Sequence, residues 1–211
     1  FDMTIIEGFG QTESCGTVTV EMLDRERRAG SCGHALPGLE VKVVDAEDNE
    51  VPHGEVGEMV LRGPTTMIGY WNMPEANKEA FRNGWLHTGD MARRDEEGYF
   101  YIVDRLRDMI ITGGFNIYPK EIEDVLYAHP SVLEATVVDV PDAVKGELAK
   151  AYIVFKEGES ATEEELDAFC RERLAAYKVP RLYEFREEPL PKNPQGKILK
   201  RILREESKAQ G

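Results

Sequence analysis

The sequence has too few cysteines for a disulfide framework or a zinc site. Its 211 residues hold only Cys15, Cys32 and Cys170, which are widely spaced and form no Cys-x-x-Cys pair. The four histidines are dispersed and add no metal-ligand spacing. The sequence shows no signal peptide and no run of about 18 apolar residues, so no transmembrane segment is expected. We therefore expect a reducing, cytoplasmic setting.

An excess of positive charge is also missing. The chain has 26 Lys and Arg against 40 Asp and Glu, which gives a net charge of −14. This balance argues against a nucleic-acid partner and against a polybasic membrane anchor. Local basic residues can still hold a phosphate, so a nucleotide ligand stays open. With 41% hydrophobic and 31% charged residues, the chain can bury a core, as one large domain or two small ones.

The first hundred residues have the pattern of an antiparallel β-rich region. Residues 3–6 predict a short buried strand that runs into a glycine-rich turn at 7–14. Alternating apolar stretches bounded by Gly and Pro then predict strands that form a curled sheet or a small barrel. These strands are expected at 39–45, 57–63 and 98–105. A short helix is expected at 73–81, opened by Pro74.

After residue 107 the pattern changes to strands mixed with helices, which predicts a compact α+β domain and a boundary within 104–107. A double glycine predicts a hairpin at 108–118, and Thr162 with Glu165 forms a capping box. Helices are expected at 119–130, at 162–178 and from 197 onward, and strands at 132–140 and 149–156.

Two stretches of the β-rich region have residues suited to a nucleotide. In "GFGQTE" (8–13), glycine-freed backbone N–H groups and Thr12 suit a phosphate, and Glu13 could hold the Mg²⁺ that a phosphate brings. The alternative is a glycine turn in which Thr12 caps a helix. In "WLHTGD" (85–90), Asp90 follows a glycine and could bind a ribose diol; the alternative is an Asx turn.

Two further stretches lie toward the C-terminus. "DRLRDMIITGGFN" (104–116) combines Arg105, a second sugar or phosphate contact, with a glycine hairpin tip that a ligand can approach closely. An ordinary hairpin is the alternative. "PLPKNPQGKIL" (189–199) places Lys197 after three prolines and a glycine. That loop either presents a cation to an anion or carries a solvated lysine before a terminal helix.

In their order and separation, these motifs resemble the adenylate-forming superfamily of acyl-CoA synthetases, luciferases and peptide-synthetase adenylation domains. Five stretches match collinearly over the whole chain: "GFGQTE", "GEVGEMVLRGPTTMIGYW", "HTGD", "DRLRDMIITGGFNIYPKEIE" and "PKNPQGK". The wording of "DMIITGGFNIYPKEIE" and "LAAYKVP" is most similar to bacterial and archaeal fatty-acyl-CoA ligases. Asn116 stands where peptide-synthetase domains usually have Arg, which disfavours that branch.

The resemblance implies a role for each matching position. The positions that would bind ATP or AMP are Phe9 (against the adenine, where Tyr is commoner), Gly10, Thr12 (α-phosphate), Asp90 and Arg105 (ribose), and Asn116. Glu13 would bind Mg²⁺, and Lys197 would be the catalytic lysine. Gly113, Gly114 and Phe115 would line the tunnel for the pantetheine arm of CoA, and Arg107 falls at the family's hinge, usually Asp or Lys.

The resemblance also implies a domain plan and a reaction. Residues 1–103 would end the large AMP-binding domain, 104–107 would be the hinge, and 108–211 would form a small lid domain with the catalytic lysine. A carboxylate would react with ATP to give acyl-AMP, and CoA would then displace AMP. The Ser/Thr/Gly-rich phosphate loop of the family occurs nowhere in the 211 residues. We therefore expect the C-terminal part of a longer ligase, inactive by itself.

Three functions remain open at this point. The first is an ATP-dependent ligase of medium- or long-chain fatty acids, with ATP, Mg²⁺ and CoA as cofactors or cosubstrates. The second is a ligase of aryl or other carboxylates. The third is a non-catalytic nucleotide- or CoA-binding module, which the presence of Lys197, Asp90 and Glu13 disfavours. The sequence leaves the oligomeric state open, a homodimer included.

Overall fold

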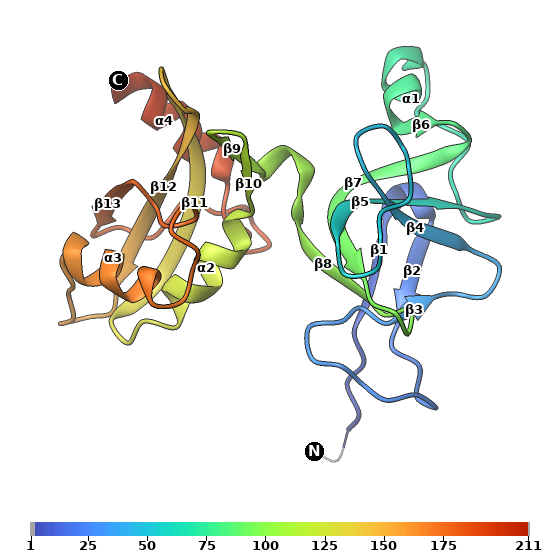
Figure 1. The fold of residues 1–211 in the computed structure, drawn as a ribbon, viewed down its shortest axis with the longest axis horizontal. Helices are drawn as coiled ribbons and strands as arrows, with labels where there is room; N and C mark the ends of the chain where they lie inside the picture. Colours follow the sequence, from blue (N-terminus) through green and yellow to red (C-terminus); the bar gives the residue numbers. More distant parts are fainter. Residues whose placement is uncertain (1–2, 211) are drawn as a thin grey trace. The chain divides into compact units, whose positions relative to one another are not determined.

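The structure, a computed structural model, describes residues 3–210 and divides the chain into two compact units, one up to Leu106 and one from Arg107 onward (Figure 1). The described residues form three β-sheets and four α-helices. The mixed α+β class expected from the sequence is therefore confirmed. Below, these parts are called unit 1 and unit 2.

Unit 1 contains two antiparallel sheets. The smaller sheet has the order β1-β2-β3, and the larger has the order β4-β5-β7-β6 with β8 paired to β7. Their strands are β1 (Gly8–Gln11), β2 (Gly16–Val20), β3 (His34–Ala35), β4 (Glu40–Val44), β5 (Val56–Arg62), β6 (Phe81–Arg82), β7 (Trp85–Arg94) and β8 (Phe100–Arg105). The one α-helix that the structure places in this unit is α1 (Pro74–Ala80), with Pro74 in its first turn.

The strands expected at 39–45, 57–63 and 98–105 are confirmed as β4, β5 and β8. The larger sheet stays open, because no pairing joins its end strands within residues 3–210. Of the two expected architectures, the small barrel is therefore wrong. The core of the unit lies where both sheets contribute apolar side chains; its fully buried members include Val18, Met59, Leu61 and Leu86.

The expectation for residues 3–14 is wrong in two respects. Residues 3–6 form no strand, and Met3 and Ile5 are 74% and 75% exposed. The stretch expected to be a turn contains strand β1 and a short 3-10 helix, Thr12–Ser14. Strand β1 needs a glycine at position 10 because β2 lies very close: a Cβ on Gly10 would lie 2.2 Å from the Gly16 carbonyl oxygen.

Unit 2 is a five-stranded sheet with helices on both faces (Figure 1). Its strand order is β10-β9-β12-β11, with β13 parallel to β12. The strands are β9 (Ile110–Thr112), β10 (Phe115–Ile117), β11 (Val132–Asp142), β12 (Gly146–Phe155) and β13 (Leu182–Arg186). The helices are α2 (Pro119–Tyr127), α3 (Glu163–Arg171) and α4 (Lys200–Gln210), and a 3-10 turn covers Leu106–Asp108.

Alternation along β11 and β12 separates the two faces of this sheet. Val137 packs in the core cluster that contains Ile122 of α2 and Leu166 of α3. The next residue, Val138, packs in a second cluster with Leu203 of α4. The terminal helix expected from its apolar stripe is thus present and covers its own face of the sheet.

Helix α3 begins as predicted and ends earlier. Thr162 N–H donates to Glu165 Oε2 (2.8 Å), and Glu165 N–H donates to Thr162 Oγ1 (3.2 Å), so the capping box is confirmed. The helix ends at Arg171 rather than near residue 178, and its last turn is tightened by an i→i−3 bond from the Arg173 N–H to the Cys170 carbonyl (3.0 Å).

Leu166→Ala is expected to destabilise the chain by about 2–5 kcal/mol, because Leu166 is fully buried between α3 and the sheet. Urea unfolding followed by circular dichroism measures the change. Leu133→Ala on β11 is the matched control, since Leu133 is 52% exposed and its loss should change stability by less than about 0.5 kcal/mol. Equal losses in the two variants would contradict the assigned core.

Candidate nucleotide, lysine and hairpin sites

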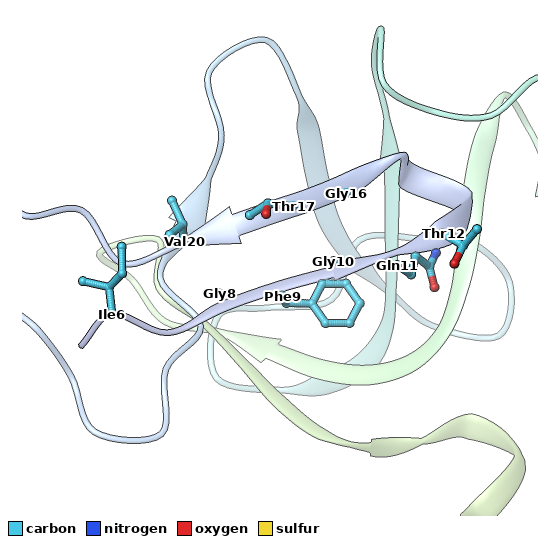
Figure 2. Close-up of a pocket in the computed structure, with 9 residues that line it drawn as sticks. All are labelled: Ile6, Gly8, Phe9, Gly10, Gln11, Thr12, Gly16, Thr17 and Val20. Carbon is cyan, nitrogen blue, oxygen red and sulfur yellow. The ribbon is translucent and has the colours of Figure 1, made fainter. Parts of the chain in front are cut away.

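The first candidate site lies on the hairpin of β1 and β2. An open pocket there brings together three predicted nucleotide contacts, Phe9, Gly10 and Thr12 (Figure 2). The Phe9 ring lies beside β1 and is half-buried against the core of unit 1, and Thr12 lies exposed at the turn toward β2. This position leaves Thr12 accessible to an anion.

Ser14 fixes the shape of this turn, and the sequence reasoning missed it. Its Oγ accepts the Gln11 N–H (3.1 Å) and lies 2.8 Å from the Gln11 carbonyl oxygen and 2.7 Å from that of Gly16. Ser14 is fully buried. Gln11 is the residue that precedes the 3-10 helix, so the alternative in which Thr12 caps a helix is wrong. A serine inside a glycine-rich stretch gives no specific signal for this network.

Glu13 is the predicted Mg²⁺ ligand and lies next to this pocket in sequence. Its Oε1 accepts the Tyr70 hydroxyl at 2.8 Å, and its Oε2 has no hydrogen-bond partner within residues 3–210. The hydrogen bond to Glu13, followed by burial, raises the pKa of Tyr70 above its ordinary value. No group of three or more His, Cys, Asp or Glu that could hold a metal exists in the described chain. A single carboxylate such as Glu13 fits a Mg²⁺ ion that arrives with phosphate oxygens, because Mg²⁺ is usually bound by one or two carboxylates together with substrate phosphates.

The two predicted ribose contacts form an ion pair. Asp90 on β7 and Arg105 on β8 are partners in the strand register, and Arg105 Nε lies 2.7 Å from Asp90 Oδ1. The Asp90 side chain is 4% exposed and that of Arg105 is 44% exposed. A ligand would therefore meet the guanidinium first and the carboxylate behind it.

Asp90 lies in strand β7, at a bulge in its pairing with β5. Gly89 has φ +70°, and its N–H donates to Glu58 Oε1 (3.0 Å). The Thr88 hydroxyl donates to the Met59 carbonyl (2.7 Å) and accepts the Asp90 N–H (3.1 Å). Glu58 was missed because its partner lies 31 residues away in sequence.

The predicted CoA contacts lie on the β9–β10 hairpin of unit 2. Gly113 and Gly114 form its two-residue turn with φ +56° and +85°, which confirms the hairpin. A Cβ on Gly114 would meet nothing within 4 Å, so the tip is open. The Phe115 ring stacks on Tyr177 with centroids 4.7 Å apart.

A cavity of about 160 Å³ lies beside this hairpin and includes Gly113 and Phe115 in its lining. Its other lining residues include two cations, Lys145 and Arg181. The Thr112 hydroxyl, on the same wall, has no partner in residues 3–210. The sequence feature that could have pointed to Arg181 as a candidate is the stretch 177–181, which combines aromatic and basic residues. Asn116 is exposed on β10 and does not line this cavity.

The loop before α4 holds Lys197 in a fixed turn. Asn193 Oδ1 accepts the N–H groups of Lys197 (2.8 Å) and Gln195 (3.1 Å), and the Asn193 N–H donates to the Lys197 carbonyl (2.9 Å). Gly196 has φ +82° and closes the turn. The Lys197 side chain is exposed and makes no ion pair in the part of the chain that the structure describes. The Lys197 ammonium is therefore accessible from solvent, and no carboxylate of the described residues neutralises its charge.

Two carboxylates anchor the ends of the Lys197 loop. Glu134 on β11 pairs with Lys192, and its Oε2 accepts the Leu190 N–H (3.0 Å). Glu123 on α2 lies 2.8 Å from Lys200 Nζ. Arg107, the predicted hinge residue, is exposed at the first position of unit 2. The candidate residues thus lie in both units: the nucleotide contacts of the first pocket in unit 1, and the lysine and hairpin in unit 2.

Known proteins match the chain in the same order as these sites. The AMP-binding enzyme family matches residues 1–71, and the AMP-binding enzyme C-terminal domain matches residues 121–197. The long-chain-fatty-acid–CoA ligase of Escherichia coli O6:H1 is 51% identical over 204 residues, and that of Bacillus subtilis is 48% identical over 204 residues. These alignments cover 97% and 96% of this chain and 36% of each relative.

Solved structures agree with these matches. ATP-bound MatB from Rhodopseudomonas palustris superposes with a TM-score of 0.90 at 39% identity, covering 97% of this chain and 41% of that one. o-Succinylbenzoate CoA synthetase from Bacillus subtilis, with its acyl-adenylate bound, gives a TM-score of 0.83 at 37% identity, covering 94% and 40%. The chain spans just over a third of the length of the curated relatives it matches.

No helix within residues 3–210 has the length and apolar character needed to cross a membrane. Two family matches in chain order, and relatives of 51% and 48% identity across nearly all of the chain, confirm the resemblance expected from the motifs: the chain belongs to the adenylate-forming superfamily of AMP-binding enzymes.

Proposed function

We propose that the chain is the C-terminal part of an ATP-dependent acyl-CoA ligase that acts on medium- or long-chain fatty acids in the cytoplasm. The observation that carries this proposal is the Lys197 loop: hydrogen bonds to Asn193 hold the backbone of Lys197, and its exposed cation makes no ion pair within residues 3–210. A binding module would have no need of such a cation. The identity to fatty-acid ligases supports the substrate class.

In the first half-reaction, the carboxylate attacks the α-phosphorus of ATP to give acyl-AMP and pyrophosphate. Two anions must meet, so the Lys197 ammonium would bridge carboxylate and α-phosphate, which is worth roughly 2.7–4 kcal/mol. Thr12 would donate to the α-phosphate, and Asp90 with Arg105 would hold the ribose hydroxyls. Glu13 would hold the Mg²⁺ bound to ATP, which supplies neutralising charge at the phosphates.

In the second half-reaction, the CoA thiol attacks the acyl carbonyl, and AMP leaves with its own phosphate charge. The pantetheine arm would pass the open tip at Gly113 and Gly114, next to the Phe115 ring. Lys145 and Arg181 beside the same cavity suit the phosphates of CoA.

The two half-reactions need different groups near one carbon atom. We propose that residues 1–103 end the large AMP-binding domain, that 108–211 form the small domain, and that 104–107 with Arg107 form the hinge between them. A rotation at the hinge would bring Lys197 and the glycine hairpin to the acyl group in turn.

A ligase of aryl carboxylates remains the second candidate. The anthranilate CoA ligase AuaEII, solved with anthranoyl-AMP, superposes with a TM-score of 0.84 at 36% identity, which is below the identity of the fatty-acid ligases.

Pyrophosphate exchange into ATP separates these candidates. In the full-length ligase, meaning this chain together with the large-domain residues that its relatives have, we expect exchange with medium- or long-chain fatty acids and little with benzoates. The 211-residue chain alone should give no exchange, because it has no phosphate loop of the family. Exchange with benzoates only would favour the aryl candidate, and strong exchange by the chain alone would contradict the domain assignment.

A further inference from the structure

The segment that follows β5 is tied to the nucleotide-side turn by two hydrogen bonds to a single residue. The Met67 N–H donates to the Glu13 carbonyl oxygen (2.8 Å), and the Tyr70 hydroxyl donates to Glu13 Oε1 (2.8 Å). Tyr70 lies 57 residues from Glu13 in sequence. Both the backbone and the side chain of the predicted metal ligand are therefore held by residues 67–70.

Tyr70 is itself held in place by helix α1. Asn77 Oδ1 accepts the Tyr70 N–H (2.6 Å), and Asn77 Nδ2 donates to the Tyr70 carbonyl (2.9 Å). Gly69 has φ +139°, and a Cβ there would lie 2.9 Å from Asn77 Oδ1, so a side chain would disturb the pair. The backbone N–H and carbonyl of Tyr70 are thus both held by Asn77, although the residue is 36% exposed.

In this arrangement one oxygen of the Glu13 carboxylate accepts a hydrogen bond and the other does not. A phenol hydroxyl that donates to Oε1 restricts rotation of the carboxylate, and Oε2 has no partner within the described residues. Carboxylates that ligate a metal are typically held by a hydrogen bond of this kind to the oxygen that does not bind the ion.

We propose that Tyr70 is a positioning residue for Mg²⁺: its hydroxyl orients Glu13 so that Oε2 is free to bind the ion that ATP carries, and Asn77 sets the position of Tyr70. This inference rests on the proposed function, because it requires a Mg²⁺-nucleotide at Glu13. The rival explanation is that the Tyr70–Glu13 hydrogen bond only joins two loops.

The test uses Tyr70→Phe in the full-length ligase, a change that removes one exposed hydroxyl and no packing volume. Isothermal titration calorimetry measures binding of a non-hydrolysable ATP analogue with and without Mg²⁺, and binding of AMP without metal. We expect the gain in affinity that Mg²⁺ gives the analogue to fall about tenfold, the lower end of the loss typical for partners of metal ligands. AMP affinity should stay unchanged.

Tyr127→Phe is the matched control, because Tyr127 is also an exposed tyrosine, at the end of α2. It should change neither measurement. Asn77→Ala should give the same selective loss as Tyr70→Phe, and the double variant should lose little more, since both changes act through the same hydroxyl.

The possible results lead to different conclusions. If the parent ligase binds the analogue better with Mg²⁺ and Tyr70→Phe keeps that full gain, the positioning role is overturned and the proposed function stands. If Tyr70→Phe weakens AMP and the Mg²⁺-analogue equally, Tyr70 only joins the two loops, and the inference is again overturned. If the parent ligase shows no Mg²⁺-dependent binding, the proposed function fails, and this inference fails with it.

Discussion

Lys197→Ala in the full-length ligase is expected to slow acyl-adenylate formation by about 10²–10³ and to leave thioester formation from supplied acyl-AMP and CoA nearly unchanged. The first step brings two anions together, the carboxylate and the α-phosphate, and needs a cation between them, whereas in the second step AMP leaves with its own charge; the ammonium is therefore assigned to the first step. The turn held by Asn193 makes no use of the Lys197 side chain and should keep its shape in the variant.

Rapid-quench measurement of each half-reaction checks this selectivity. Lys208→Ala is the matched control, because Lys208 is another exposed lysine of unit 2, on α4, and should leave both rates unchanged. Acetylation of Lys197 removes the same charge and should reproduce the alanine variant. An equal loss in both half-reactions would mean that Lys197 supports the fold or both sites, and the proposed role would be wrong.

Gly114→Leu should have the opposite selectivity, with acyl-AMP accumulating and the thioester step slowed. A Cβ on Gly114 has nothing within 4 Å, so we expect the bulk of a leucine there to act mainly on a ligand that passes the hairpin. Single-turnover assays that start with ATP and fatty acid, or with acyl-AMP and CoA, separate the two steps.

Backbone strain is the competing explanation, because a leucine at φ +85° is disfavoured wherever it lies. Gly158→Leu controls for it: Gly158 has φ +76°, belongs to the same unit, and also has nothing within 4 Å of its Cβ position. The control should cost comparable stability and leave both half-reactions intact. If Gly114→Leu slows both steps to the same degree, the hairpin has a structural role only.

The sequence predicted those elements whose formation is decided by neighbouring residues. The Thr162–Glu165 capping box, the Pro74 helix start and the Gly113–Gly114 hairpin all depend on contacts within a few residues, and all three are present. The error at residues 3–14 has the opposite origin. Gly10 lies in a strand because β2 packs against it, and glycine by itself predicts a turn.

The same distinction applies to the candidate site. Motifs within one stretch pointed to Glu13 and Asp90 as candidates, while side chains that fix the Glu13 carboxylate and the backbone next to Asp90 are distant in sequence. Glu58 reaches Gly89 across 31 residues, and Tyr70 reaches Glu13 across 57. No local pattern contains such a pair, so the structure was needed to find it.

The products formed by the full-length ligase from ATP, Mg²⁺ and a long-chain fatty acid in the absence of CoA test the central claim most directly. Chromatography with mass spectrometry should detect enzyme-bound acyl-AMP and one equivalent of pyrophosphate, and later addition of CoA should convert the acyl-AMP into acyl-CoA and AMP. Formation of ADP and phosphate, or release of AMP without any acyl-adenylate, would contradict the account.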